Sequence, residues 1–318
     1  MSMFLRITAQ RIAFGIMMLL MTSVIIFAGI EILPGDVAQA MLGQSATPDT
    51  VAQLRLELGL DRPAIVRFGE WLTNAIQGDF GRSYTNKLDI ASEIAHRLKN
   101  TLLLAAGAAL ISIPLALFLG LLGVLYSDGI VDRVTSILVV GGISVPEFFM
   151  GYILIFVFAV GWQWFPSNAA VYDGMPISDR LYQMALPIAT LVLATLGHMQ
   201  RMTRAAILDL MSAPFIETAR LKGLNTANII IHHALPNAVA PIINVVMLNI
   251  GYLIVGVVLV EVVFTYPGIG QYFVDHVTMR DAPVIQACGL VFATVYIMLN
   301  LIADLVSAYS NPRIRHPR

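Results

Sequence analysis

The sequence predicts an all-α integral membrane protein with six transmembrane helices and with both termini in the cytoplasm. Composition is the first reason, because 58% of the 318 residues are hydrophobic and only 12% are charged, whereas soluble domains average about 25% charged residues. The net charge of −1 gives no indication of nucleic acid as a partner. The single cysteine, Cys288, cannot form a disulfide within the chain and leaves the redox compartment open. Lipid is therefore the expected surrounding of most of the chain.

Six apolar stretches are long enough to cross a membrane, which is the second reason. A helix needs roughly 20 apolar residues to span about 30 Å of hydrocarbon, because its backbone polar groups must be satisfied within the helix. The stretches cover residues 12–32, 102–125, 134–161, 185–196 with their flanks, 239–260 and 284–306. Pro114, Pro146 and Pro187 predict kinks in three of them. A split at Pro146 would instead give a seventh span and reverse the later topology.

The distribution of basic residues decides between six and seven spans. With six spans and a cytoplasmic N-terminus, the inside segments hold Arg6, Arg11, Arg133, Arg201, Arg204, Arg220, Lys222, Arg313, Arg315 and Arg318, and the short outside loops hold Arg180 and Arg280. Cytoplasmic loops carry the excess of Lys and Arg in membrane proteins. The seven basic residues of 34–100 do not count against this topology, because long loops are translocated largely regardless of charge.

This topology divides the chain into four parts. Residues 1–33 form an N-terminal segment with the first span, 34–100 an extracytoplasmic helical region, 101–310 a five-span core with a cytoplasmic loop at about 201–236, and 311–318 a cytoplasmic tail. The first span also has features of a cleavable signal, with Ala38-Gln39-Ala40 as the cleavage site. Its uncharged run of about 19 residues exceeds the 7 to 15 of a signal core, which favours a retained span.

Three short helices are expected in the extracytoplasmic region. Thr47, Pro48 and Asp49 give the start of the first, which closes at Gly59, because a cap, a proline and an acid favour a helix N-terminus. The second opens after Asp61 and Pro63 and ends near Gly78. The third, Asp89 to Lys99, carries Ile90, Ile94 and Leu98 on one face and is expected to lie along the membrane interface.

The cytoplasmic loop predicts a helix, a sharp turn and a second helix. Pro214 opens the first helix and Glu217 lies in its first turns, where the helix dipole favours an anion. Gly223 supplies the left-handed residue that ends it. Asn225 or Thr226 then caps a second helix toward Pro236.

These residues resemble the coupling motif of ATP-binding-cassette importer permeases, which is E-A-A, three residues, G, nine residues, I-x-L-P. Glu217, Ala219, Gly223, Leu235 and Pro236 stand at matching positions. Thr218 replaces the middle Ala and His233 stands where Ile is usual. Together with Arg220 and Lys222, these departures resemble the dipeptide/oligopeptide/nickel branch of the family, where they are common.

Segments along nearly the whole chain resemble the B-type permease of that branch. They are Arg11-Ile12, Leu33-Pro34-Gly35-Asp36, Leu58-Gly59-Leu60-Asp61-Arg62-Pro63, Gly78-Asp79-Phe80-Gly81-Arg82-Ser83, Ser144-Val145-Pro146-Glu147-Phe148-Phe149, Trp164-Phe165-Pro166, Glu261 to Gly270, and Asn311-Pro312-Arg313. The resemblance implies a type I importer permease fold in the bacterial inner membrane. It also implies four partners: a second homologous permease, two cytoplasmic ATPases and an extracytoplasmic solute-binding protein.

The same resemblance implies how the work is divided. The residues expected to couple to an ATPase are Glu217, Thr218, Ala219, Arg220, Lys222, Gly223, Leu235 and Pro236. The chain has no G-x-x-x-x-G-K-[ST] loop to cradle phosphates, so ATP and magnesium are expected on the ATPase subunits and no cofactor on this chain. The implied cargo is a short peptide, a glutathione-like solute or a nickel chelate, and peptides are favoured.

Polar residues near the spans and two residues of the turn after the fifth span are candidates for the pathway or a gate. They are Glu147, Asn244, Asn249, Glu261, Pro267 and Gly268. Asn244 shares a helix face with Asn237 and Gly251, while Asn249 shares another with Gly256. Such stripes line a conduit or pack helices together, and the sequence leaves both open.

Glu147 faces a wet cavity or caps the helix after the proline break, and these alternatives also stay open. An ionisable side chain at membrane depth costs about 2.5 to 3.5 kcal/mol on insertion scales, so each needs a reason. Glu261 precedes a turn with Pro267 and Gly268 that is expected to fold the chain back at the outer surface.

Two other classes of function compete with an importer subunit. A secondary transporter or channel without an ATPase predicts internal repeats with paired broken helices, and no convincing repeat is found in the sequence. An intramembrane enzyme predicts H-E-x-x-H, G-x-S-x-G or paired intramembrane aspartates, and the sequence has none of these. Neither class explains the cytoplasmic loop, so the chain is expected not to be an enzyme.

Overall fold

The computed structural model describes residues 3–32, 37–127 and 129–310. The segments Leu33-Pro34-Gly35-Asp36 and Asn311-Pro312-Arg313, the tail 311–318 with Arg315 and Arg318, and the side chain of Arg6 lie outside the described residues. The helices are α1 (Met3–Ile32), α2 (Val37–Leu42), α3 (Pro48–Glu57), α4 (Ala64–Ile76), α5 (Ile90–Leu125), α6 (Ile130–Ser144), α7 (Glu147–Leu154), α8 (Ile177–Met211), α9 (Pro214–Leu221), α10 (Thr226–Ile229), α11 (Leu235–Val263), α12 (Ile269–Thr278) and α13 (Ala282–Ser310). A 3₁₀ turn, η1 (Gly43–Ser45), and two π-helical stretches, η2 (Ile155–Gly161) and η3 (Ile230–Ala234), complete them.

The predicted all-α membrane architecture is confirmed. Among the described residues, five helical stretches are long and apolar enough to cross a membrane, and a bent pair of helices makes a sixth. The five are Thr8–Ile32, Ile90–Leu125, Ile177–Met211, Thr226–Val263 and Ala282–Val306, and the pair is Asp132–Ser144 with Glu147–Gly161. The predicted number of six is reached when the pair counts as one span.

The chain bends by 104° between the two helices of this pair, which is a break rather than the predicted kink. Val145 is extended, with φ −101° and ψ 126°, because the ring of Pro146 disfavours helical backbone in the residue before it. α6 has 15 residues, or about 22 Å of helix, which is short of the roughly 30 Å that a separate span needs. The seven-span alternative is therefore disfavoured.

Two of the three helices expected between α1 and the second span are confirmed. Thr47 caps α3 in a reciprocal capping box with Thr50, and α4 runs over Ala64–Ile76. The third expectation is wrong, because residues 90–99 are the first turns of the uninterrupted α5. Ile90 and Ile94 are buried against α12 and α13, so their face is filled by protein rather than laid along a membrane interface.

The chain forms two compact units, each described by itself. Unit 1 comprises Met1–Thr101 and Pro267–Met298, and unit 2 comprises Leu102–Tyr266 and Leu299–Arg318. In unit 1, α5, α12 and α13 share a core that includes Tyr272, Val284 and Cys288. The rings of Phe27 on α1 and Phe68 on α4 pack edge to face, with centroids 5.3 Å apart.

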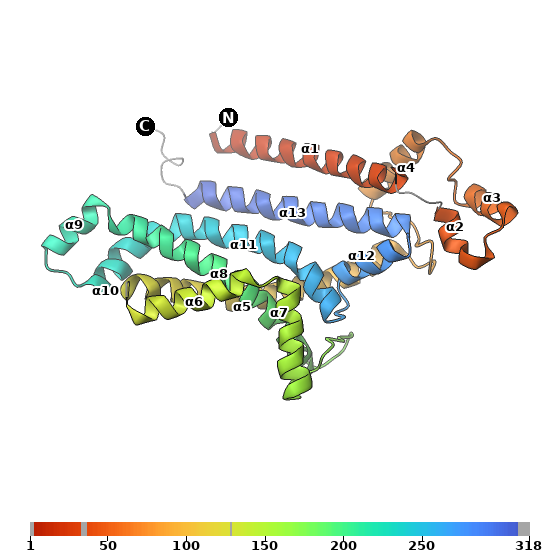
Figure 1. Ribbon diagram of the computed structural model, residues 1–318. Coiled ribbons are helices and arrows are strands. Elements are labelled where there is room, and N and C mark those ends of the chain that lie inside the picture. Colours follow the sequence, from red (N-terminus) through yellow and green to blue (C-terminus); the bar gives the residue numbers. More distant parts are fainter. Residues whose placement is uncertain (1–2, 33–36, 128, 311–318) are drawn as a thin grey trace. The chain divides into compact units, whose positions relative to one another are not determined.

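In unit 2, α8 is the central helix. It packs against α6, α7 and α11 (Figure 1). α9 and α10 lie at one end of α8 and α11 (Figure 1). α7 begins at the end of α6 that is far from α9 and runs at a steep angle to α6 (Figure 1). The candidate site lies in the segment that connects α8 to α11.

Candidate functional site

The first half of the connecting segment is α9, and it begins as predicted. Pro214 stands in the first turn and Glu217 follows as the acid of that turn. The hydroxyl of Thr218 donates to the carbonyl of Pro214 at 3.1 Å. These are local features of a helix start, so the predicted N-terminus is confirmed.

The turn after α9 depends on Gly223, whose φ is +79°. The backbone N–H of Leu224 donates to the carbonyl of Ala219 at 3.3 Å, and that of Gly223 donates to the carbonyl of Arg220 at 2.9 Å. This pair of bonds satisfies the last carbonyls of the helix in a Schellman motif, which requires a left-handed residue. The prediction for Gly223 is confirmed.

The second half of the segment runs from α10 through η3 into α11. Of the two predicted caps the structure selects Asn225, whose side chain accepts from the N–H of Asn228 at 2.8 Å. His233 lies in the π-helical stretch, and Leu235 and Pro236 begin α11. Single π-helical turns inside helices occur often at functional sites.

The segment is anchored to unit 2 by two apolar side chains of α9. Ile216 is fully buried and Ala219 is 5% exposed. They share a core with Val124 of α5, Ile207 of α8 and Ile242 of α11, among others. These two anchors therefore connect α9 to three long helices of the unit.

The exposed residues of α9 and of the turn after it combine charge with exposed apolar area, and we call them the α9 surface. Its charged members are Glu217, Arg220 and Lys222, all exposed. Its apolar members are Phe215, Leu221 and Leu224, with 42%, 84% and 39% of their surface exposed. The sequence analysis missed these three apolar residues, because their exposure depends on which face the anchors bury.

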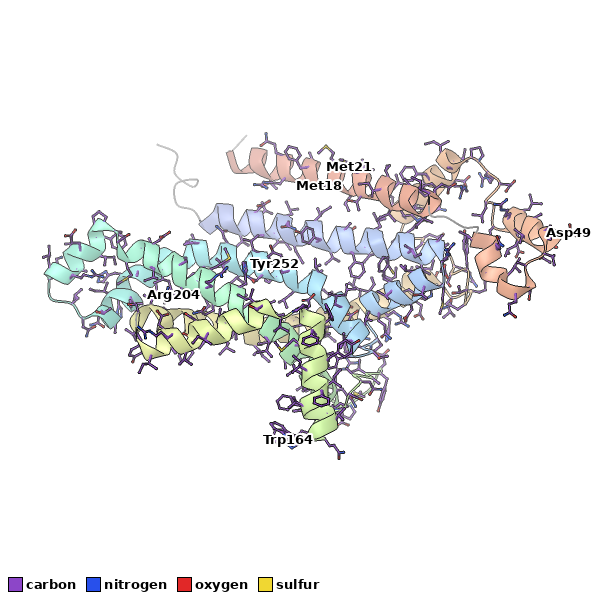
Figure 2. The ribbon with its side chains drawn as sticks, in the orientation of Figure 1. Met18, Met21, Asp49, Trp164, Arg204 and Tyr252 are labelled. Atoms are coloured by element: carbon purple, nitrogen blue, oxygen red, sulfur yellow. The ribbon has the colours of Figure 1, made fainter. Side chains whose placement is uncertain are left out.

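A second feature missed from the sequence is the ion pair of Arg204 with Asp132, and Arg204 lies at the same end of unit 2 as α9 and α10 (Figure 2). The Nη2 of Arg204 on α8 donates to the Oδ2 of Asp132 on α6 at 2.7 Å. The two side chains are only 27% and 10% exposed. The Nε of Arg204 also donates to the carbonyl of Gly123 at the end of α5, at 3.4 Å. The pair therefore ties α8 to the end of α5 and to the start of α6.

Among the pathway candidates, Glu147 lies closest to another helix. It begins α7, and a Cβ added to Gly256 of α11 would stand 2.5 Å from its Oε2. Among the described residues, burial is the one influence found on its carboxylate, with no hydrogen-bonding or charged partner. Gly256 is thus the small residue that admits the carboxylate between α7 and α11.

The two asparagine candidates of α11 occupy different environments. Asn249 is 1% exposed, and its Nδ2 donates to the carbonyl of Val245 in its own helix at 2.8 Å. Asn244 is exposed on the surface of the single chain. The structure therefore does not place both on one polar face.

The remaining candidates surround the turn after α11. Glu261 is fully buried in unit 2, and the turn that follows contains Thr265 with a φ of +50°. In unit 1, the carbonyl of Pro267 accepts from the Nδ2 of Asn100 at 3.0 Å, and Gly268 precedes α12 as its N-cap. The fold-back of the chain at the outer surface therefore stays a prediction.

Comparisons with known proteins agree with this architecture. The family described as "Binding-protein-dependent transport system inner membrane component" matches residues 112–316. The N-terminal family "Binding-prot-dependent transport system membrane comp, N-term" matches residues 3–105.

Individual relatives match over almost their whole length. The glutathione transport system permease protein GsiC of Escherichia coli K12 is 36% identical over 298 residues, which cover 94% of this chain and 95% of the relative. The probable peptide ABC transporter permease protein y4tP of Sinorhizobium fredii is 34% identical over 307 residues, covering 96% and 98%. The chain thus belongs to the family of binding-protein-dependent transport system inner membrane components, and it is a multi-pass permease subunit of an ABC importer rather than a catalytic subunit.

Proposed function

We propose that the chain is one of two permease subunits of an ATP-driven importer of short peptides, including glutathione-like peptides. Two cytoplasmic ATPases bind ATP and magnesium, and a solute-binding protein delivers the cargo from outside. Both termini and the segment 214–236 lie in the cytoplasm. The peptide class is supported by the names of the relatives, which are glutathione and peptide permeases.

The α9 surface is the observation that carries this proposal. A groove on an ATPase receives Phe215, Leu221 and Leu224 as apolar anchors, while Glu217, Arg220 and Lys222 form the polar rim. Interfaces typically have an apolar centre and a charged border of this kind. Ile216 and Ala219 then transmit closure of the ATPases to α5, α8 and α11 as a lever. Thr218, Gly223, Leu235 and Pro236 hold the shape of the lever.

Alternating access in this scheme uses the polar residues of α7 and α11 and the turn that follows α11. Glu147 and Asn244 face the pathway or the second permease, because neither is closed off inside the single chain. Asn249 and Glu261 act from within the helix packing, since both are buried. Pro267 and Gly268 shape the outer turn that opens and closes.

The test compares two exposed leucines in the tagged complex. Leu221→Glu changes the α9 surface, and Leu56→Glu is the matched control, because Leu56 is 67% exposed on α3. Leu221→Glu is expected to reduce both the retained ATPase and the ATP-driven uptake of glutathione by at least about tenfold, the effect of losing an interface anchor. Leu56→Glu is expected to leave both unchanged. Uptake by the isolated chain without ATP would refute the importer scheme, and equal behaviour of the two variants would refute docking on α9.

A further inference from the structure

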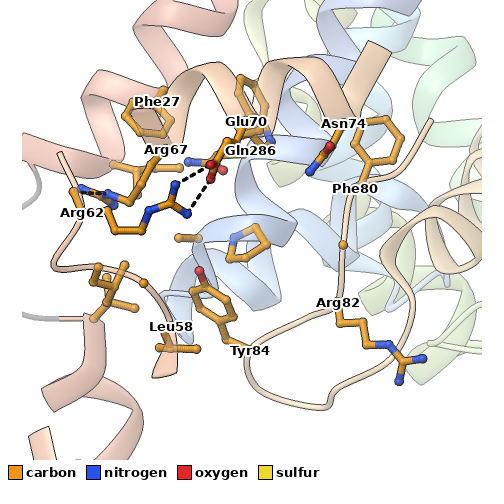
Figure 3. A pocket seen from close by; sticks show the side chains of 18 of the residues that line it. Phe27, Leu58, Arg62, Arg67, Glu70, Asn74, Phe80, Arg82, Tyr84 and Gln286 are labelled. Atoms are coloured by element: carbon orange, nitrogen blue, oxygen red, sulfur yellow. Dashed lines mark hydrogen bonds and ion pairs between the residues drawn. The ribbon is translucent and has the colours of Figure 1, made fainter. Parts of the chain in front are cut away.

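Unit 1 contains a cavity of about 470 Å³ that the coupling scheme does not use. Its walls come from α1, α3, α4, the segment 79–84 and the start of α13 (Figure 3). The volume lies within the range of about 300 to 1,000 Å³ of small-molecule sites. On the proposed topology the cavity faces the extracytoplasmic side, where cargo arrives.

The cavity wall carries fixed charges of both signs. The guanidinium of Arg62 forms a two-bonded fork with the carboxylate of Glu70, and the Nη1 to Oε2 distance is 2.8 Å (Figure 3). The Nη2 of Arg67 donates to the Oε1 of Glu31 at 2.6 Å. The side chains of Arg62 and Glu70 are 47% and 52% exposed. Ion pairs that are so exposed are weak, so the charged ends of a ligand can exchange with them at little cost.

Some hydrogen-bonding groups in the cavity wall have no partner among the described residues. The indole N–H of Trp71 is buried and finds no acceptor among the described residues. The amides of Asn74 and Gln286 also line the cavity, and the described part of the chain offers neither side chain a bond. A ligand rich in carbonyl and carboxylate oxygens satisfies the donors of these two amides.

One side of the cavity is held rigidly by Asp281, which is fully buried. Its carboxylate accepts from the hydroxyls of Ser83 and Thr85 at 2.6 and 2.9 Å, and from the N–H groups of Tyr84 and Thr85 at 3.1 and 3.0 Å. These bonds fix Tyr84, whose hydroxyl points into the cavity (Figure 3). Burial, and next the charge of Asp281, raise the pKa of Tyr84, so the phenol stays a neutral hydrogen-bond donor.

We propose that this cavity is a binding site for a short zwitterionic peptide on the permease itself. Arg62 binds the peptide carboxylate and Glu70 binds its ammonium group. The amides of Asn74 and Gln286 donate to its backbone carbonyls, and Trp71 and Tyr84 pack against a small side chain. For the class of cargo the inference rests on the proposed function, but it places a second, separate contact with that cargo in unit 1.

The test measures binding to the complete transporter in nanodiscs, without the binding protein and without ATP. Trialanine is the probe, trialanine amide lacks the carboxylate, and calorimetry gives the affinities. Trialanine is expected to bind saturably, and both Arg62→Gln and removal of the carboxylate should weaken binding by at least about tenfold, the value of one charge-assisted bond. The two losses should not add, because they remove the same contact. Arg133→Gln is the matched control, since Arg133 is exposed on α6 in unit 2.

Each contrary result has one meaning. Absence of saturable trialanine binding, or equal affinities of Arg62→Gln and Arg133→Gln, overturns the peptide site. If Arg62→Gln weakens capture of the binding protein while trialanine does not bind, the cavity is a protein-docking site and the inference also fails. ATP-driven uptake of trialanine with the binding protein present is measured in parallel. Uptake without direct binding refutes only this inference, whereas direct binding without ATP-dependent uptake refutes the proposed function.

Discussion

Two polar connections in this permease are held in opposite ways. The segment 214–236 of unit 2 is fastened by apolar anchors, Ile216 and Ala219, and turns its charges outward. The segment 79–85 of unit 1 is fastened by the buried carboxylate of Asp281, which accepts hydrogen bonds from Ser83, Tyr84 and Thr85. Apolar anchoring leaves the polar side chains of a segment free to contact a partner. In a buried polar network, the polar side chains are instead occupied by hydrogen bonds within the chain.

The difference indicates different mechanical roles. Apolar contacts are non-directional and tolerate small shifts of a helix, which suits the moving lever that we propose for α9. A satisfied network of buried hydrogen bonds specifies one geometry, which suits a fixed wall. If this comparison holds, substitutions in the Asp281 network should act mainly on stability, and substitutions around α9 mainly on coupling.

The largest expected effect is on stability in unit 1. Asp281→Ala removes the acceptor of four hydrogen bonds, one of them from the buried hydroxyl of Ser83, which should cost about 3 to 5 kcal/mol of unfolding free energy in total. Asp281→Asn keeps one acceptor oxygen and should cost less. Denaturant titration in micelles, followed by tryptophan fluorescence, measures both, and Asp275→Ala on the exposed face of α12 is the control. Equal unfolding midpoints for Asp281→Ala and Asp275→Ala would contradict the claim that the Asp281 network holds the segment 79–85 in place.

A smaller effect is expected from the pair of Arg204 and Asp132. Arg204→Asp places two carboxylates where the structure has a bond of 2.7 Å, and it should cost about 1 to 3 kcal/mol, because the pair is partly buried. The reversed pair, Arg204→Asp with Asp132→Arg, should recover most of this loss. The measurements are the unfolding midpoint and the peptide-stimulated ATPase activity of the complex.

This pair also sharpens the comparison. If the reversed pair restores stability but not stimulated ATPase activity, the ion pair contributes to coupling as well as to packing. If neither single variant changes either quantity, Arg204 and Asp132 do not tie α8 to α6 in solution.

Local features of the sequence predicted more than contacts between distant residues. The start at Pro214, the turn at Gly223 and the cap at Asn225 each depend on neighbours within a few residues, and the family resemblance identified the segment. The bond between Ser83 and Asp281 joins residues 198 positions apart, and no local pattern indicates it.

Two further features were beyond the sequence for a related reason. The spacing of Ile90 and Ile94 fits a helix on a membrane surface as well as a buried one, and only the packing of α12 and α13 against them decides. Pro146 predicts an interruption, but the 104° bend depends on how α7 packs against α8 and α11.

The smallest expected effect on stability is at Gly223. Substitutions there change the backbone angle of the turn after α9 without changing the side chains that we expect to contact the ATPase. A Cβ added there meets no atom within 4 Å, so the cost of a substitution comes only from its φ of +79°. Gly223→Val should cost about 1 to 2 kcal/mol, because a β-branched residue resists left-handed backbone, and Gly223→Asn should cost less, since Asn tolerates it. Neither variant changes a side chain of the α9 surface.

The measurement is the stimulated ATPase activity of complexes with equal amounts of bound ATPase. If Gly223→Val loses this activity and Gly223→Asn retains it, the angle of the chain after α9 transmits the movement of the ATPases to the permease. If both variants keep normal stimulated ATPase activity, docking of the α9 surface alone is sufficient for coupling. The segment 214–236 then serves as a docking site, and its turn has no mechanical role.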